Sequence, residues 1–409
     1  MNVLWVATKP PWPPVDGGRL VQWLTLEALR ELAVDVTLVA PFVGAGRRGR
    51  SPVDVERELG RVCTADLAAA RSTPRLARAA ALRPGVPLSI ARHLRPDVRR
   101  RVARRLDAGR YDLVHVEQLQ ALPQAEPAFA RGVPVVLRAQ NVESDLWRQV
   151  ARRSRGPVRW LADREGRRLE RWERDAVRRV ASAVGLTRDD AGRLGRLAGE
   201  PHRVATIPAP FPAELPAGPA QERGRPAVVL IGGGWLPNRD AERWFVRDVW
   251  PAVVRRLPEA RLHLYSDGGG RWAGPTIAAH PPPVESVEAF GAGSVLAVPL
   301  RIASGVRMKI LEAWARGIPV VATPEAAAGL ETGSAAALAL AGDAAGFAAA
   351  LARLVEDPGA RARQLTAGRE ALRRGHDPGA IGRRWADLYA RVAGAEPGRT
   401  RAPVTAGSR

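Results

Sequence analysis

The stretch PLRIASGVRMKILEAWARGIPVVATP (residues 299–324) is the part of the sequence that best defines the fold. It begins with the last two residues of the apolar run SVLAVPL. A helical pattern follows from Val306 to Ala315, and the stretch ends in a second β-rich run, IPVVATP. A strand, a helix and another strand in this order predict a β-α-β unit of a parallel sheet. Residues that follow the first strand then lie at the carboxyl edge of the sheet, where α/β domains bind ligands. We expect ligand-binding residues there at Arg301, Ser304 and Gly305.

Two basic side chains, Arg307 and Lys309, lie in the first turn of the expected helix. Positive charges there oppose the helix dipole, so a bound anion would offset their cost, and a diphosphate is the anion that we expect. Lys309 supports this interpretation because the chain has only one other lysine, Lys9. The alternative is a solvated helix start. Glu312 shares the helix face of Lys309, either as a salt-bridge partner or as a carboxylate for sugar or ribose hydroxyls.

A second candidate site is the segment TKPPWPPVDGGRL (residues 8–20), in which a proline-rich turn and Gly17-Gly18 precede a helix. Paired glycines at a helix N-terminus let backbone N–H groups approach an anion closely. The same glycines would also suit a tight turn that binds nothing. The segment lacks a G-x-G-x-x-G pattern, which argues against a nicotinamide-dependent enzyme.

Alternating strands and helices fill both halves of the chain. At 409 residues the sequence is too long for one hydrophobic core, and two parallel-sheet α/β domains are expected. We expect a first domain over residues 1–208 with an arginine-rich helical insertion at about 47–110, a proline-rich linker at 209–226, a second domain at 227–376, a last helix at 377–392 and a disordered tail at 393–409. The active site is then expected in the cleft between the domains.

Several polar residues follow or end strands of the first half. His115 and Glu117, in YDLVHVE, face the same side of a strand and could orient an acceptor hydroxyl. Gln140, Asn141 and Glu143, in RAQNVES, could contact a sugar or an acceptor. A buried structural histidine and loop-capping residues are the alternative interpretations.

The composition excludes several classes of protein. The single cysteine, Cys63, excludes an internal disulfide framework and a cysteine metal cluster. No run approaches the roughly 20 apolar residues that span a bilayer. The N-terminal run MNVLWVAT is interpreted as a strand and not as a signal peptide. These features favour a cytoplasmic protein.

The net charge of +21 comes almost entirely from arginine. A solvated arginine surface, attraction to an anionic membrane and attraction to a polyanion are the three interpretations. The most basic stretch, residues 91–110, has no aromatic residue, which argues against a nucleic-acid module. An arginine-rich insertion that faces a membrane would place the protein peripherally at its inner face.

The segment GVRMKILEAWARGIPVVAT (residues 305–323) resembles the donor-binding motif of the retaining glycosyltransferases of family four, the glycosyl transferases group 1. It is similar to the branch in which G-x-R-x-K-x-x-E precedes A-x-G-x-P-V-V. Further segments resemble this family in the same order: PPWPPVDGGRL, YDLVHVEQLQ, RAQNVESDLWRQVARR and IGGGWLPNRDAERWFVRDVWPAVVRRLPEARL. The resemblance implies a GT-B fold, with two Rossmann-like domains facing across a cleft, the acceptor side first, the nucleotide-sugar donor side second, and the last helix returning to the first domain.

By this resemblance, Arg307 and Lys309 neutralise the diphosphate leaving group and Glu312 holds the donor ribose. The implied donor site also contains Gly17, Gly18, Gly233, Arg301, Ser304, Gly305 and Val306. The implied reaction retains the anomeric configuration, uses a UDP- or GDP-type donor and needs no metal or other cofactor. Ser304 stands where many relatives have a glutamate, and Gln140, which cannot act as a general base, stands where relatives often have a histidine.

The acceptor stays open among a glycan, a lipid-linked molecule and a small molecule. The leading hypothesis is a glycosyltransferase. A non-catalytic nucleotide-sugar-binding protein that supports a partner is the alternative, because of Ser304 and Gln140. Another GT-B enzyme, such as a nucleotide-sugar epimerase, is a third hypothesis.

Overall fold

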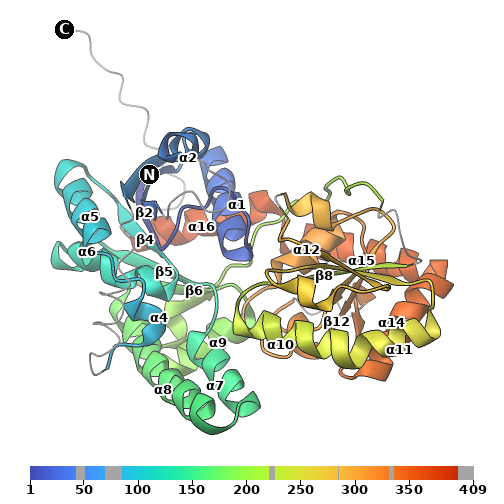
Figure 1. The fold of residues 1–409 in the computed structure, drawn as a ribbon. Helices are drawn as coiled ribbons and strands as arrows, with labels where there is room; N and C mark the ends of the chain where they lie inside the picture. Colours follow the sequence, from blue (N-terminus) through green and yellow to red (C-terminus); the bar gives the residue numbers. More distant parts are fainter. Residues whose placement is uncertain (43–50, 70–84, 221–225, 284, 331–335, 395–409) are drawn as a thin grey trace.

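The computed structural model describes residues 1–42, 51–69, 85–220, 226–283, 285–330 and 336–394. These residues form two α/β domains, each built on a parallel sheet with helices on both faces (Figure 1). The prediction of two parallel-sheet domains is therefore confirmed. Residues 395–409 of the expected tail and residues 221–225 of the expected linker lie outside the described residues.

The first domain contains a seven-stranded sheet in the order β3-β2-β1-β4-β5-β6-β7, and every pairing is parallel. Its strands are β1 (Asn2–Ala7), β2 (Asp35–Phe42), β3 (Thr64–Ala69), β4 (Leu113–Glu117), β5 (Val135–Ala139), β6 (Ser182–Gly185) and β7 (Val204–Thr206). The central strands β4 and β5 are buried along their whole length. Helices cover both faces of such strands, which explains their nearly continuous apolar sequence.

The helices of the first domain pack on both faces of this sheet. They are α1 (Gly17–Glu31), α2 (Pro52–Leu59), α4 (Leu88–Ala91), α5 (Pro96–Ala108), α6 (Glu126–Ala130), α7 (Glu143–Arg153), α8 (Gly156–Arg179) and α9 (Arg188–Ala198), with 3-10 turns η1 (Leu119–Ala125) and η2 (Pro201–Arg203). The segment 47–110 is expected to be helical, but it also supplies β3, the edge strand of the sheet. A six-residue edge strand containing Asp66 lacks the apolar run that identifies a central strand.

The second domain contains a six-stranded sheet in the order β10-β9-β8-β11-β12-β13, also parallel throughout. Its strands are β8 (Ala227–Ile231), β9 (Arg261–Tyr265), β10 (Ile277–His280), β11 (Val295–Val298), β12 (Val320–Ala322) and β13 (Ala339–Leu340). Its helical elements are α10 (Leu236–Trp244), η3 (Phe245–Val249), α11 (Trp250–Arg256), η4 (Gly269–Trp272), η5 (Ser286–Ala289), α12 (Met308–Ala315), α13 (Pro324–Ala327), α14 (Ala344–Glu356) and α15 (Pro358–Gly375). The last helix, α16 (Pro378–Val392), follows them in the chain.

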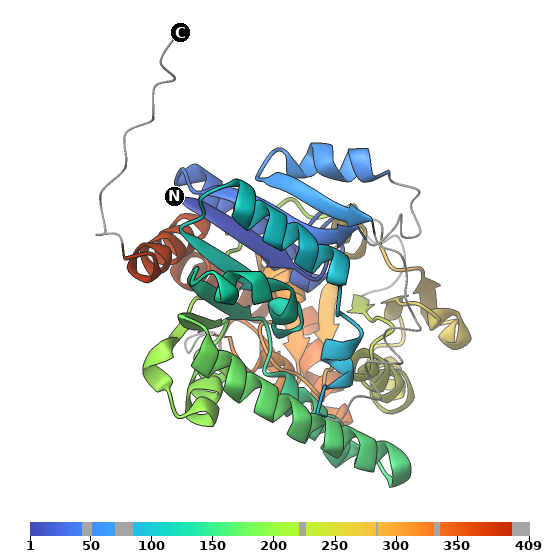
Figure 2. The same cartoon turned by 90° about the vertical axis from the view of Figure 1, so that its left-hand side faces the viewer.

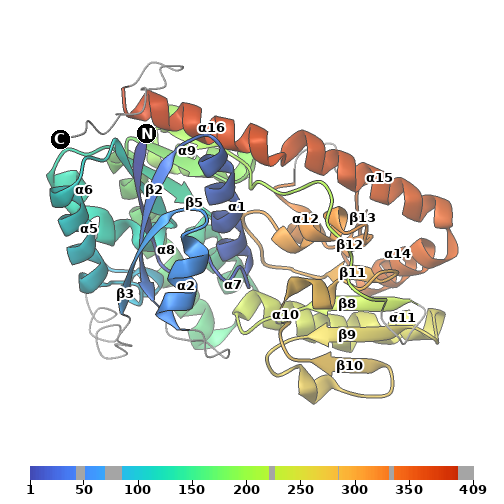
Figure 3. The ribbon, with the colours of Figure 1, turned by 90° about the horizontal axis from the view of Figure 1, so that it is seen from above.

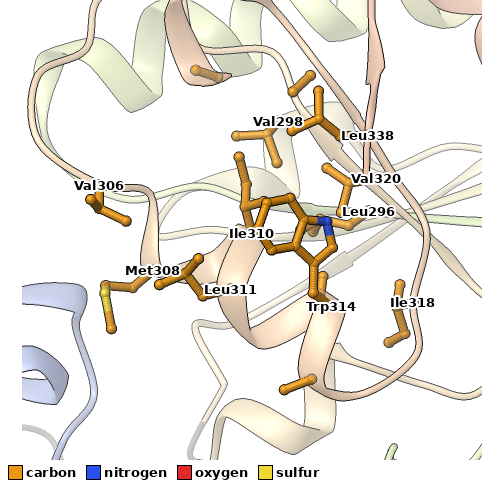
Figure 4. Packing of buried hydrophobic residues seen from close by; sticks show 14 of the residues in the cluster. Leu296, Val298, Val306, Met308, Ile310, Leu311, Trp314, Ile318, Val320 and Leu338 are labelled. Atoms are coloured by element: carbon orange, nitrogen blue, oxygen red, sulfur yellow. The ribbon is translucent and has the colours of Figure 1, made fainter. Parts of the chain in front are cut away.

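The core of the second domain holds helix α12 in place. Aliphatic side chains of β11 and β12 pack around Trp314, which is 1% exposed (Figure 4). A Cβ on Gly368 of α15 would lie 2.7 Å from the Trp314 ring, so the glycine permits close packing of α15 on this side. Met308, at the start of α12, points instead toward the first domain (Figure 4).

Helices α15 and α16 follow one another along one side of both domains (Figure 3). Helix α16 packs on α1 of the first domain, where Trp385 and Tyr389 are completely buried. Gly382 allows the close approach, because a Cβ at this position would lie 3.1 Å from the Cβ of Ala28. The end of the described chain is therefore part of the first domain's core.

Candidate functional site

A cavity of about 1020 Å³ lies between the two domains. Helices α1 and α12 lie side by side where the domains meet (Figure 1), and both contribute residues to the cavity lining. The first domain supplies the proline-rich and glycine segment 10–21 and residues 140–141, and the second domain supplies residues 231–232, 282–283, 285–286 and 306–309. The cleft that the sequence places between the domains is therefore large enough for a nucleotide-sized ligand.

The segment before α12 is a loop that is docked onto the first domain. Gly305 has a φ of +72°, and a Cβ at this position would overlap the carbonyl oxygen of Gln140. Both features require glycine. The helix begins at Met308, two residues later than the sequence predicts, with Arg307 as its extended N-cap residue. The expected helix start at Val306 is wrong because the docked loop continues through that residue.

Arg307 and Lys309 both line the cavity, as the sequence predicts. The Nε of Arg307 is shielded from solvent and has no hydrogen-bond partner among the described residues. Burial lowers the pKa of Arg307 to about 10, although Asp190 opposes this shift. Burial, and then repulsion from Arg307, lowers the pKa of Lys309 to about 8. The Lys309 ammonium donates to the carbonyl oxygen of Ile231 at 2.7 Å.

Glu312 also lines the cavity and is 6% exposed. Its salt-bridge partner is Arg316, one turn further along α12, at 2.8 Å, and not Lys309. Both hydrogen bonds from Arg316 end on Oε1 of Glu312. The carboxylate can therefore also accept from a ligand hydroxyl through Oε2.

The glycine segment lies directly opposite α12. Asp16 caps α1 by accepting from the backbone N–H of Arg19 at 3.0 Å, and it also accepts from Lys9 at 2.7 Å. A Cβ on Gly17 would lie 3.2 Å from Cγ of Met308, so the two domains come close together here. Arg19 lines the cavity, and its buried Nε has no hydrogen-bond partner in the described structure, although it lies 3.4 Å from Oδ2 of Asp16 as an ion pair. Sequence analysis missed Arg19, although it is a basic residue in the first helical turn, like Lys309.

Two glycosyltransferase family models match the chain in order. The glycosyl transferase 4-like domain matches residues 17–210 and the glycosyl transferases group 1 domain matches residues 225–357. The structure resembles HepE of Anabaena in complex with UDP-glucose, with 14% identity, a TM-score of 0.65 and coverage of 96% of this chain and 100% of that chain. It also resembles sucrose-phosphate synthase of Thermosynechococcus elongatus, with 15% identity, a TM-score of 0.66 and coverage of 97% and 99%. The chain is a GT-B glycosyltransferase.

At these identities the structural likeness shows the fold, and the family models show the class of enzyme. The search of curated proteins finds no match to this glycosyltransferase. In the described part of the chain, no three His, Cys, Asp or Glu side chains are grouped as metal ligands. No described helix has both the length and the hydrophobicity of a bilayer-spanning segment.

Glu117 of the glycosyltransferase is completely buried behind the cavity wall. Burial alone would raise the pKa of Glu117, but ion pairing with the equally buried Arg138 holds it below its ordinary value. Arg138 also donates to Thr25 at 2.7 Å. Gln140, which does line the cavity, donates to Glu117 at 2.7 Å and to the carbonyl oxygen of Gly18 at 3.1 Å. This network fixes Gly18 of the glycine segment.

His115 is also completely buried, and it does not line the cavity. Its ring stacks on Trp5 at 3.6 Å, its Nε2 lies 3.3 Å from Glu117, and its Nδ1 lies 2.8 Å from the hydroxyl of Tyr389. Burial lowers its pKa to about 4, so Nε2–H donates to the carboxylate and Nδ1 accepts from the tyrosine. The placement of His115 and Glu117 as acceptor-orienting residues is therefore corrected: His115 joins β4 to α16 through Tyr389, and Glu117 pairs with Arg138 of β5.

Ser304 connects the two domains. Its hydroxyl donates to Asp190 of α9 at 2.9 Å and accepts from the backbone N–H of Val142 at 2.9 Å. Asp190 also accepts from the backbone N–H of Gly305 at 3.1 Å. Asn141 lines the cavity, and its amide group donates to the carbonyl oxygen of Ser304 at 2.9 Å. Sequence analysis missed Asp190 because nothing in the sequence pairs it with a loop 114 residues away.

The other expected residues lie outside the cavity wall. Arg301 pairs with Asp240 at 2.7 Å and lies over the ring of Trp244. Glu143 begins α7, where burial raises the pKa of its carboxyl. Gly233 is adjacent to Gly232, which does line the cavity. None of these three residues is among those that line this cavity, and their expected roles stay predictions.

The rest of the cavity wall is strongly apolar on the side of the first domain. Pro10, Trp12, Val15, Phe42 and Val55 line it. Three of them belong to the expected glycine segment, whereas Phe42 and Val55 come from two other segments that meet it only in the fold. A ligand in this part of the cavity would contact mainly apolar side chains.

Proposed function

We propose that this glycosyltransferase uses a UDP- or GDP-type sugar donor, whose diphosphate binds in the cavity between the domains. The observation that carries the proposal is the convergence of three basic side chains on this cavity: Arg19 of the first domain, and Arg307 and Lys309 of the second. The shielded Nε of Arg307 has no hydrogen-bond acceptor among the described residues, and the Nε of Arg19 has only a 3.4 Å ion-pair contact with Asp16. Diphosphate oxygens are suitable acceptors for guanidinium groups.

These three residues would act on the leaving group. When the bond between the anomeric carbon and the diphosphate oxygen breaks, negative charge develops on that oxygen. Fixed cations in a partly desolvated cleft stabilise this charge without having to reorganise. Glu312, through Oε2, would accept a hydrogen bond from a ribose hydroxyl, in the role that the family resemblance implies.

The proposal includes retention of configuration, which rests on the resemblance of residues 305–323 to retaining enzymes. His115 and Glu117 are buried behind the wall and Gln140 has no basic atom, so none of the three is suited to take the acceptor proton. We therefore assign this proton to the departing diphosphate oxygen, as the acceptor oxygen attacks from the same face. The acceptor is a glycan, a lipid-linked molecule or a small molecule, and the apolar wall around Trp12 would contact an apolar part of it.

A thermal-shift titration with UDP, GDP, dTDP and ADP tests the donor assignment. One diphosphate should raise the melting temperature selectively, because a ligand that binds only the folded protein stabilises it. The Lys309→Ala variant should lose this shift, whereas Arg255→Ala, at an exposed position of α11, should keep it. The absence of a shift with every nucleotide in the folded wild type would contradict the donor site.

A non-catalytic nucleotide-sugar-binding protein is the second candidate. Ser304 and Gln140 motivate it, because both are engaged in hydrogen bonds between or within the domains and neither supplies a charge. Release of free nucleotide from the matching nucleotide sugar, measured with and without a panel of acceptors, separates the two candidates. Donor binding without any nucleotide release would favour the second one.

A further inference from the structure

Helices α7 and α8 form a hairpin that reaches the lower edge of the molecule in Figures 1 and 2. The residues at its end, 155–161, are all exposed, and we call them the tip patch. Three of them are large and apolar: Val158 is 54% exposed, Trp160 60% and Leu161 43%. They are three of the nine exposed large apolar residues in the described chain, so this end of the hairpin is an unusual concentration of apolar surface.

The tip patch is separate from the interior of the hairpin. The inner faces of α7 and α8 bury Leu146, Val150 and Ala162 against Ile302 of the second domain. Trp160 contributes nothing to this cluster, and its ring lies 5.3 Å from the guanidinium of Arg164 on the outer face of α8. Core packing therefore does not explain why three apolar residues occupy the first two turns of α8.

The surroundings of the tip patch are strongly basic. Arg152, Arg155 and Arg159 are exposed at the end of the hairpin, and no ion pair is found for them in the described structure. Further along α8, the exposed outer face carries Arg164, Arg167, Arg171 and Arg178. Most acidic side chains on this helix form ion pairs with arginines: Asp163 pairs with Arg167, Glu170 with Arg148 and Asp175 with Arg174.

Helix α5 provides a useful contrast. It lies in the arginine-rich segment that the sequence suggests as a membrane-facing surface, and it exposes several arginines. Its apolar residues Val98 and Val102, however, are completely buried against the first domain. The start of α10 also exposes a tryptophan and a leucine, Trp235 and Leu236, near Arg239, but Trp235 there lines the cavity between the domains.

We propose that the tip patch docks this protein on an anionic lipid surface. Val158, Trp160 and Leu161 enter the interfacial region, where tryptophan is favoured because its ring is apolar and its N–H is polar. The arginines at the end of the hairpin and along α8 contact the anionic headgroups. The net charge of +21 adds long-range attraction to the same surface. This inference is independent of the proposed sugar transfer.

Sedimentation with phosphatidylcholine vesicles, with and without phosphatidylglycerol, tests the proposal on the full chain. The wild type should bind only the anionic vesicles, and added salt should weaken the binding. The Trp160→Ser/Leu161→Ser variant should bind at least about tenfold more weakly, because the apolar contribution is lost. Val53→Ser and Leu340→Ser are matched controls at exposed apolar positions of the two domains and should bind like the wild type.

Quenching by brominated lipids gives a second readout, because it reports tryptophan that enters the bilayer. Bound wild type should be quenched, and Trp160→Phe should bind but lose most of this quenching. Three outcomes would overturn the proposal: no binding to anionic vesicles, equal binding by the double variant, and quenching that does not depend on Trp160. Self-association would also overturn the proposal. In that case the wild type would form a concentration-dependent dimer through the tip patch, and of the variants only the double variant would lose this dimer.

Discussion

At the scale of single residues, Lys309 has the property that is easiest to test by titration. Its ammonium attracts a diphosphate only while it is protonated, and burial lowers its pKa to about 8. The attraction is therefore complete well below pH 8 and is lost as the pH rises through that value. Arg307, with a pKa of about 10, stays charged over most of this range.

We predict that the Kd for the bound nucleoside diphosphate rises by about tenfold between pH 7 and pH 9.5, the effect of one linked proton. Calorimetric titrations at several pH values measure this dependence. In Lys309→Met the affinity should be lower at pH 7 and nearly independent of pH. The same pH slope in wild type and Lys309→Met would assign the titration to another group.

The buried pair of Glu117 and Arg138 allows a second test at the scale of single residues. Because both are buried, we expect Glu117 to have a structural role. Removing one partner of a buried ion pair leaves an uncompensated charge. We predict that Glu117→Gln lowers the free energy of unfolding by about 3–5 kcal/mol. Denaturant unfolding measures this change, and Glu117→Gln/Arg138→Met should recover part of the loss. A variant of wild-type stability that is inactive would return Glu117 to a catalytic role.

At the scale of elements, the loop before α12 joins the two domains through Gly305. We predict that Gly305→Ala lowers the free energy of unfolding by roughly 1–3 kcal/mol, because it combines an unfavourable φ with a clash against Gln140. Gly293→Ala is the matched control, since Gly293 has a φ of +83° but no atom within 4 Å of the position that a Cβ would occupy. Equal losses in the two variants would show that contact with Gln140 contributes nothing.

Helix α16 follows the second domain in the sequence, and we predict that it stabilises the first domain, on which it packs. Trp385 is completely buried against α1 and the first sheet. Trp385→Ala should therefore cost about 3–5 kcal/mol, as for other large buried side chains. Thermal unfolding followed by circular dichroism measures the loss. The exposed substitution Trp160→Ala is the control and should leave the melting temperature nearly unchanged.

At the scale of the whole molecule, the sequence is sufficient to predict the two sheets but not all their strands. Strands β4, β5 and β11 are buried, mostly apolar runs followed by helical sequence, because both faces of each strand are covered. Strands β3, β10 and β13 lie at a sheet edge and lack such a buried apolar run. The start of α12 is misplaced because contacts with the first domain determine it.

The candidate site was predictable where its residues belong to a motif, as in the glycine segment with Gly17 and Gly18 and in the segment before and within α12. Arg307, Lys309 and Glu312 belong to one segment, and all three line the cavity. Arg19 and Asp190 come from the other domain, and their relation to this segment depends on how the domains pack. Alternation along β4 puts His115 and Glu117 on one face, but it does not reveal that this face is covered by α16.

The most direct test of the central claim is a calorimetric titration of wild type, Arg19→Met, Lys309→Met and the double variant with the nucleoside diphosphate that stabilises the fold. If one diphosphate is held from both domains, each single variant should weaken binding by about tenfold or more, the effect of a charge-assisted hydrogen bond. Arg255→Met, exposed on the second domain, should bind like the wild type. Wild-type affinity in both single variants would contradict a donor site between the domains.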